Sequence, residues 1–201
     1  MDDLTKEHII DVYSKSLMLH GPSKSEAVFW SNKGQSARFN AIASLVPYKS
    51  GLSLLDYGCG LGDLHSHLRT SGFDIAYTGM DINPTLIEAA RSKHPGVQFK
   101  VHDIERGGLS GSFDISVLCG VFNYKAEGVN ESFINTLRLL MGKTRMRLIA
   151  TALSSRAERK QYDLNYHDPD ELLATLKSEV SHKAWIDVET VPDGIVIVIE
   201  R

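Results

Sequence analysis

A cluster of glycines and aspartates follows a short apolar run near residue 55. The run Leu52–Tyr57 carries Asp56, glycines follow at positions 58, 60 and 62, and Asp63 comes directly after them. Glycine at such positions lets the backbone turn sharply and approach a ligand closely. Carboxylates on both sides of the turn suit a ligand that carries a positively charged group.

Two further aspartates follow the next two apolar runs. Asp81 lies 23 residues beyond Gly58, where a carboxylate can accept hydrogen bonds from both hydroxyls of a ribose. Asp103 precedes Ile104, a pair that could accept a bond from an adenine amino group and pack on its face. Ligands of an open α/β sheet bind beyond the carboxyl ends of its strands, so these residues indicate a nucleoside ligand.

The spacing of the glycines separates two kinds of nucleoside ligand. The dinucleotide fingerprint G-x-G-x-x-G, counted from Gly58, needs a glycine where this chain has Asp63. An aspartate at a helix start also repels a pyrophosphate. S-adenosylmethionine has an amino group, a sulfonium, a ribose diol and an adenine, and no phosphate. The sequence therefore favours S-adenosylmethionine over a dinucleotide.

Alternating apolar runs predict the elements that position these residues. Strands are expected at 52–57, 75–80, 97–101, 113–119, 146–153, 184–191 and 195–199, and helices at 61–71, 85–93, 131–141 and 169–179. Strands that alternate with helices predict a parallel sheet covered on both faces. The last two strands are joined by a turn at 192–194, too short for a parallel crossover. We therefore expect a Rossmann-like α/β fold, with a mostly parallel seven-stranded sheet and an antiparallel C-terminal hairpin.

The first fifty residues differ from the rest, because they predict helices at 4–19 and 37–45 and no strand. We expect an N-terminal helical cap segment at 1–50 and the nucleoside-binding domain at 51–201.

Composition narrows the range of partners. The 201 residues carry a formal charge of −3, 42% are hydrophobic, and two are cysteines. This composition predicts a globular chain without a disulfide framework. The basic cluster at Lys143, Arg145 and Arg147 is interpreted as a solvated turn. No signal-like segment or long apolar run is present, so the expected location is the cytoplasm, without a membrane or nucleic-acid partner.

Four segments together resemble the motifs of class I S-adenosylmethionine-dependent methyltransferases. Residues 54–64 resemble the first motif, 79–84 the second, 102–104 the third and 113–118 the fourth. The resemblance extends over roughly 37–201 and implies a methyltransferase that uses S-adenosyl-L-methionine. No metal is expected, because His65 and His67 have no Cys, Asp or Glu partner at ligand spacing.

The resemblance implies cofactor contacts at the ends of the four strands. The methionine part is expected to lie against Asp56, Gly58, Cys59 and Gly60, with the backbone of Cys119 near its amino group.

The remaining parts of the cofactor are assigned in the same way. Asp81 is expected to hold the ribose, with Ile82 against the adenine, and Asp103 to meet the adenine amino group beside Ile104. Arg38 is expected to meet the cofactor carboxylate, the alternative being an arginine on a helix surface.

The acceptor side is marked by fewer residues. Asn123 and Tyr124 follow the fourth strand without the prolines of the Asn-Pro-Pro-Tyr motif, which weakens a nucleic-acid base or glutamine target. Either could act on substrate or simply pack on the core. His167 is a candidate general base or a polar residue before a helix, and Tyr13 and Trp30 are candidate substrate contacts or structural residues.

These observations predict direct in-line methyl transfer to oxygen or nitrogen of a small molecule. A nucleic-acid-directed methyltransferase and a cyclase or lyase acting on S-adenosylmethionine itself are the alternatives. The oligomeric state is left open.

Overall fold

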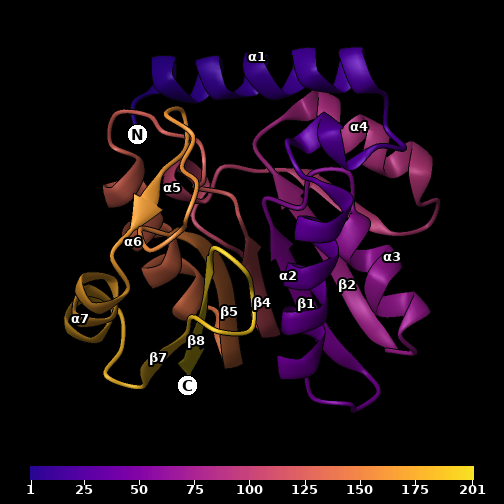
Figure 1. Ribbon diagram of the computed structural model, residues 1–201. Coiled ribbons are helices and arrows are strands. Elements are labelled where there is room, and N and C mark those ends of the chain that lie inside the picture. Colours follow the sequence, from indigo (N-terminus) through magenta and orange to yellow (C-terminus); the bar gives the residue numbers. More distant parts are fainter.

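A twisted eight-stranded sheet forms the centre of the computed structural model, which describes residues 1–201 (Figure 1). Seven strands follow the order β3-β2-β1-β4-β5-β8-β7, and the two-residue β6 pairs with β5. The strands are β1 Leu52–Tyr57, β2 Ile75–Asp81, β3 Gln98–Val101, β4 Phe113–Cys119, β5 Thr144–Ser154, β6 Tyr166–His167, β7 Ala184–Asp187 and β8 Gly194–Glu200. The Rossmann-like prediction is confirmed, with β6 as one strand more than expected.

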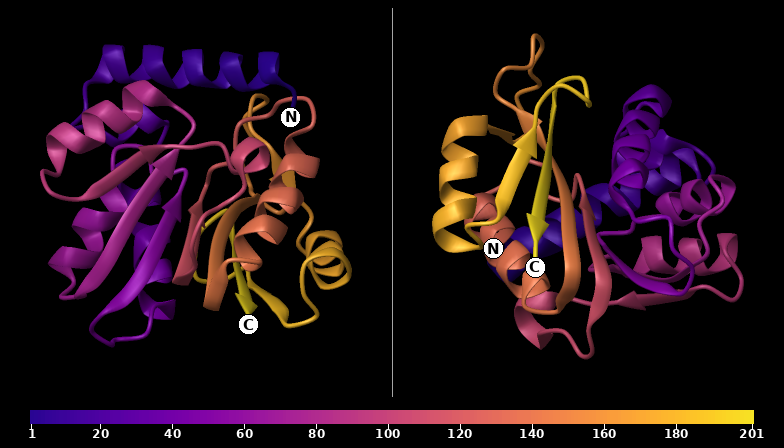
Figure 2. Two further views of the ribbon diagram at one scale, coloured as in Figure 1. Left: turned by 180° about the vertical axis from the view of Figure 1, so that it is seen from behind. Right: turned by 90° about the horizontal axis from the view of Figure 1, so that it is seen from below.

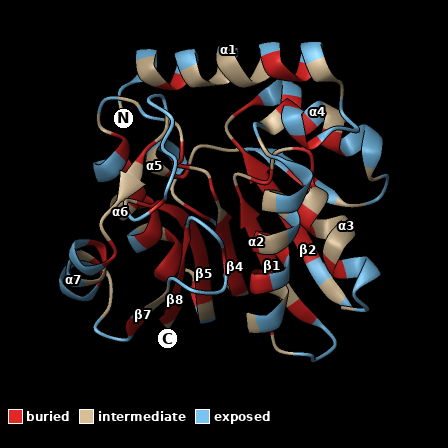
Figure 3. Cartoon of the chain, viewed as in Figure 1, coloured by how far each residue is buried: buried red, intermediate tan, exposed pale blue.

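Helices cover both faces of this sheet (Figure 2). They are α1 Asp3–His20, η1 Ser25–Val28, α2 Asn32–Leu45, α3 Asp63–Thr70, α4 Pro84–Lys93, α5 Ile104–Gly107, α6 Val129–Met141 and α7 Pro169–Glu179. Side chains of α2, α3 and α4 pack into one apolar core, and those of α6 and α7 into the other. The central strands β1, β4 and β8 are almost wholly buried, whereas the edge strand β3 buries one of its four residues (Figure 3). The short α5 was not predicted, because four residues show no helical periodicity.

Parallel pairing brings the carboxyl ends of the first strands to one edge. Asp56 in β1 lies opposite Gly79 in β2, and Asp81 in β2 lies opposite Val101 in β3. β4 continues the parallel set beside β1. The chemistry-bearing residues at the ends of β1 to β4 are therefore placed side by side, as the topology predicted.

The C-terminal hairpin is antiparallel, but its first strand is shorter than predicted. β7 ends at Asp187 rather than at residue 191. The Asp187 carboxylate accepts hydrogen bonds from the backbone N–H groups of Glu189 (2.7 Å) and Thr190 (3.0 Å). This turn, formed by the side chain, diverts the backbone from the sheet, so a longer loop joins the two strands.

The N-terminal residues divide between two roles. Helix α1 lies across the carboxyl edge of the sheet (Figure 1), where the Asn83 side chain donates to Ile10 O at 3.0 Å. Helix α2 instead buries Phe39 and Ile42 in the core. The boundary at residue 50 stays a prediction. None of the helices has the length and apolar character needed to cross a membrane.

Candidate active site

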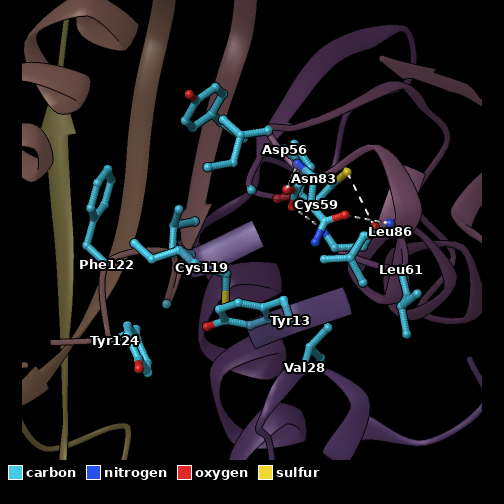
Figure 4. A pocket seen from close by; sticks show the side chains of 18 of the residues that line it. Tyr13, Val28, Asp56, Cys59, Leu61, Asn83, Leu86, Cys119, Phe122 and Tyr124 are labelled. Carbon is cyan, nitrogen blue, oxygen red and sulfur yellow. Dashed lines mark hydrogen bonds between the residues drawn. The ribbon is translucent and has the colours of Figure 1, made fainter. Parts of the chain in front are cut away.

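A cavity opens at the carboxyl edge of the sheet, beneath α1 (Figure 4). It encloses about 1170 Å³ when the space at its mouth is included, and 18 of its 30 lining residues are hydrophobic. Pockets for small ligands and cofactors are mainly apolar with a few polar groups. The lining of this cavity has that character, because carboxylates are set among mostly apolar side chains.

The glycine loop after β1 forms one wall of the cavity and is held by backbone hydrogen bonds. Gly58 has φ +76°, and a Cβ there would lie 2.2 Å from a methyl carbon of Val121. The Gly58 and Cys59 N–H groups both donate to Met80 O, at 2.6 and 3.0 Å. Only glycine fits at position 58, because both the conformation and the space exclude a side chain.

Asp81 lies behind this loop at the end of β2. Its two oxygens accept from Gly60 N at 3.0 Å and from Asn83 N at 2.9 Å. Burial raises the pKa of the Asp81 carboxyl above its usual value. These bonds fix the carboxylate at the cavity wall and leave lone pairs for further donors such as ribose hydroxyls.

Asp56 has an unpartnered oxygen at the end of β1. Its Oδ2 accepts from the Tyr77 hydroxyl at 2.5 Å, while Oδ1 is buried without a hydrogen-bond partner. Burial raises the pKa of the Asp56 carboxyl to about 7. An unpaired buried acceptor is costly, and a ligand ammonium group would satisfy it.

The third aspartate is already in contact with helix α1. Lys6 Nζ lies 2.8 Å from both Asp103 Oδ2 and Glu105, whose backbone N–H donates to Asp103 Oδ1 at 3.0 Å. Burial opposes the charged form of Lys6, but the two carboxylates raise its pKa overall. Asp103, Glu105 and Ile82 line the cavity, whereas Ile104 is buried just outside it.

Arg38 is buried and pairs with no carboxylate. Its guanidinium stacks on the Trp30 ring, 4.5 Å from the ring centroid, and donates to Gly34 O at 3.1 Å. Its Nε has no partner, and burial lowers its pKa. Arg38 lies behind the cavity wall, of which Trp30 and Cys119 are part.

The candidates on the acceptor side separate into two groups. Tyr13, Trp30 and Tyr124 line the cavity, and Asn123 and His167 do not. His167 lies 3.2 Å from Asn165 Nδ2, and burial lowers its pKa, which favours the neutral imidazole. The backbone oxygen of Asn123 accepts from Asn165 N at 2.8 Å.

The residues present fit S-adenosylmethionine. Asp56 offers an unpaired acceptor for an amino group, the loop at Gly58 and Gly60 allows close approach, and Asp81 is placed for a ribose. The only basic side chain lining the cavity is Lys6, which is held by two carboxylates. This arrangement has no site for a pyrophosphate.

Comparison with known proteins agrees with this fit. A family model described as "Methyltransferase domain" matches residues 48–187. The chain belongs to this methyltransferase family. It is an S-adenosylmethionine-dependent methyltransferase of class I, and the motif-based resemblance is confirmed.

Two curated relatives of this methyltransferase differ in how much of their length it matches. Rv1506c of Mycobacterium tuberculosis, named as a methyltransferase, is 30% identical over 135 residues, which cover 64% of this chain and 81% of that protein. The malonyl-[acyl-carrier protein] O-methyltransferase of Acetivibrio thermocellus is 36% identical over 78 residues, 38% of this chain and 28% of that protein. The chain thus spans about a quarter of the latter relative.

Solved structures of methyltransferases share the fold at low sequence identity. DhpI bound to S-adenosylhomocysteine aligns with a TM-score of 0.74 at 15% identity, over 100% of this chain and 98% of that one. Magnesium protoporphyrin IX methyltransferase from Synechocystis PCC 6803, with bound S-adenosylmethionine, gives 0.61 at 18% identity, over 84% and 80% of the two chains. The small RNA methyltransferase HEN1 gives 0.65 at 15%, over 86% and 26%.

Sequence reasoning missed several residues of this site. Lys6 forms ion pairs with both Asp103 and Glu105. The Tyr77 hydroxyl donates a hydrogen bond to Asp56, and the Phe122 ring forms part of the cavity wall. Lys6 shows no pattern that would mark it, because its partners lie about 100 residues away. The position of Lys6 on the buried face of α1 was the one signal that could have marked it.

Proposed function

We propose that this methyltransferase transfers its methyl group directly to an oxygen or nitrogen atom of a small molecule. The observation that carries the proposal is helix α1, which lies over the cavity and contributes Ile9, Ile10 and Tyr13 to its lining. A roofed, mainly apolar cavity suits a compact acceptor better than a polymer strand.

The cofactor supplies an electrophilic methyl group on a sulfonium sulfur, and the acceptor's lone pair bonds to that carbon while the carbon–sulfur pair stays on sulfur. We infer that Asp81 binds the ribose hydroxyls and Asp56 the amino group, which fixes the direction of attack. Asp103 would accept from the adenine amino group. Arg38 would reach the cofactor carboxylate only if the Trp30 ring moves aside.

Tyr124 is the candidate catalytic residue that the cavity favours. It lines the cavity, and its hydroxyl lies 3.4 Å from His8 Nε2 on α1, so a proton released by the acceptor has a path to the surface. Asn123 and His167 stay predictions, but neither is among the lining residues. The remaining work of the site is to align the acceptor and exclude water.

The charge distribution gives no support to a nucleic-acid substrate. Arg145 pairs with Asp114 at 2.9 Å and Arg147 with Glu200 at 2.7 Å, both at the start of β5 and thus at the opposite end of the sheet from the cavity. A strand of nucleic acid needs free cations along its path. The cytoplasmic location stays a prediction from the sequence.

Product analysis with labelled cofactor tests the proposal. Incubation with extracts of small metabolites should give S-adenosylhomocysteine and one methylated small molecule. Methylthioadenosine would instead indicate a cyclase or lyase. Label transferred to RNA, with a salt dependence typical of phosphate contacts, would replace the small-molecule proposal.

A further inference from the structure

Four of the aromatic rings that line the cavity come from α1, from the segment before α2 and from the loop after β4. Tyr13 comes from α1, Trp30 from the segment between η1 and α2, and Phe122 and Tyr124 from the loop after β4. In Figure 4, Phe122 and Tyr124 lie on the opposite side of the view from Asp56, and Tyr13 lies nearer the middle beside Cys119. Chain segments distant in sequence thus contribute flat apolar surfaces to one cavity.

The two rings of the N-terminal segment are each supported from behind. Tyr13 meets Phe29 edge-on, with centroids 5.1 Å apart and an interplanar angle of 85°. Trp30 is stacked on Arg38 at 4.5 Å, and its Cζ2 closely approaches Gly120, where a Cβ would lie 2.4 Å from that atom. Such packing holds the rings in fixed orientations.

The rings after β4 are supported in the same way. Phe122 packs on Phe133 of α6 with centroids 5.5 Å apart, and Tyr124 packs on His8 of α1 at 6.1 Å. All four rings are therefore preorganised, which lowers the entropy cost of stacking a planar ligand between them.

The charges that line the cavity are strongly one-sided. Two cations, Lys6 and the N-terminal ammonium of Met1, face five carboxylates. Lys6 is held at 2.8 Å by two of these carboxylates, and the ammonium lies 3.7 Å from Glu105. The carboxylates are Asp56, Asp63, Asp81, Asp103 and Glu105. The nearby cation of Arg38 is covered by Trp30. An anionic acceptor would therefore find no unpaired cation among the residues that line the cavity.

We propose that the methyl acceptor is an uncharged, planar aromatic molecule that stacks among Tyr13, Trp30, Phe122 and Tyr124. The inference rests on the proposed function and names the substrate class of the same cavity. Carboxylate, phosphate and phosphonate acceptors would lack a partner cation in this lining, while an aromatic hydroxyl or amine stacks on the rings without needing one.

Fluorescence of Trp30 tests the proposal without turnover. The chain has two tryptophans, and Trp185 on β7 lies outside the cavity, so Trp185→Phe leaves Trp30 as the one indole reporter. Protein saturated with S-adenosylhomocysteine is titrated with methyl para-hydroxybenzoate and with para-hydroxybenzoate. A hydroxynaphthoate ester and its acid form a second, larger pair. Within each pair the ring and hydroxyl are the same and only the charge differs.

The neutral ester of at least one pair should change Trp30 fluorescence and bind at least tenfold more tightly than its acid. Equal or tighter binding of the acids would overturn the proposal, and so would no response to any ester. Calorimetry with S-adenosylhomocysteine distinguishes a failure of the proposed acceptor class from a failure of the proposed function. Cofactor binding with a preference for acids refutes only the uncharged class of acceptor, whereas absence of cofactor binding refutes the proposed function.

Turnover with labelled cofactor gives a second readout. The neutral phenols should accept label on oxygen, and Phe122→Ala should raise KM for them at least tenfold with a smaller effect on cofactor affinity. Transfer of label to the carboxylate of an acid probe, or an unchanged KM in Phe122→Ala, would contradict the stacking role.

Discussion

The two ends of the cavity are built in different ways. At the cofactor end, one loop and three strand ends supply backbone groups and carboxylates. The Asp81 carboxylate, for example, accepts two backbone hydrogen bonds. At the acceptor end, α1, the segment before α2 and the loop after β4 supply aromatic rings, each of which packs on another side chain behind it. The first end is fixed by strand pairing, and the second depends on how three separate segments pack. Substitutions at the two ends of the cavity should therefore have different effects.

Asp81→Ala should give the largest effect at the cofactor end. We expect S-adenosylhomocysteine affinity to fall about 100-fold, because two hydrogen bonds to a charged group contribute roughly 1.5 kcal/mol or more each. Calorimetry measures this, with Asp74→Ala as control because Asp74 lies exposed in a turn before β2. An unchanged dissociation constant would place the ribose elsewhere.

The ionisation of Asp56 should make cofactor binding depend on pH. Burial raises its pKa from 3.8 to about 7, so a ligand ammonium group binds best once the carboxyl has lost its proton. Affinity should fall by up to about tenfold per pH unit below pH 7. Calorimetry between pH 5.5 and 8 measures the slope, which Asp56→Asn should remove. A slope that persists in Asp56→Asn would assign the proton to another group.

The same shift predicts the stability of the ligand-free protein with the opposite sign. Between its unfolded value of 3.8 and its folded value of about 7, Asp56 keeps a proton in the folded chain that the unfolded chain has lost. The contribution of this group to the free energy of unfolding therefore falls as pH rises through that window. Asp56→Asn should be stabilised relative to the parent above pH 7, as thermal unfolding at several pH values would show.

Gly120→Ala tests the packing of the acceptor end. Position 120 has φ +67°, and a Cβ there would lie 2.4 Å from Trp30. Gly111→Ala is the matched control, because Gly111 has φ +80° with open space around it. Gly120→Ala should cost about 1–3 kcal/mol more in unfolding free energy than Gly111→Ala, since overpacking adds to the backbone strain. Equal losses in denaturant titrations would show that Trp30 is not held against the loop.

Lys6→Met should have the smallest effect and tests how α1 is attached. Removing the cation leaves Asp103 and Glu105 close together, with Arg106 and the Met1 ammonium each 3.7 Å away as their remaining cations, so we expect a loss of about 1–2 kcal/mol. Lys15→Met on the same helix breaks an exposed pair with Asp11 and should cost less than about 0.5 kcal/mol. Denaturant unfolding compares the two variants, and equal losses would contradict the attachment of α1 by Lys6.

The sequence predicted the cofactor end far better than the acceptor end, for a physical reason. Asp56, Gly58 and Asp81 occupy strand ends whose alignment follows from alternating strands and helices, so local patterns located them. Lys6 and Phe122 act through contacts with residues that are not neighbours in sequence, and no local period marks them. The error at β7 had a local cause, since the turn at Asp187 depends on one side chain rather than on hydrophobicity.

The central claim is that the carboxyl edge of this sheet binds S-adenosylmethionine and not a dinucleotide. Calorimetric titration of the full chain with S-adenosylhomocysteine, and in parallel with NAD, tests it most directly. We predict one binding site per chain with a micromolar dissociation constant for S-adenosylhomocysteine and no measurable heat with NAD. Binding of NAD, or the absence of S-adenosylhomocysteine binding by folded protein, would contradict the assignment of the cavity.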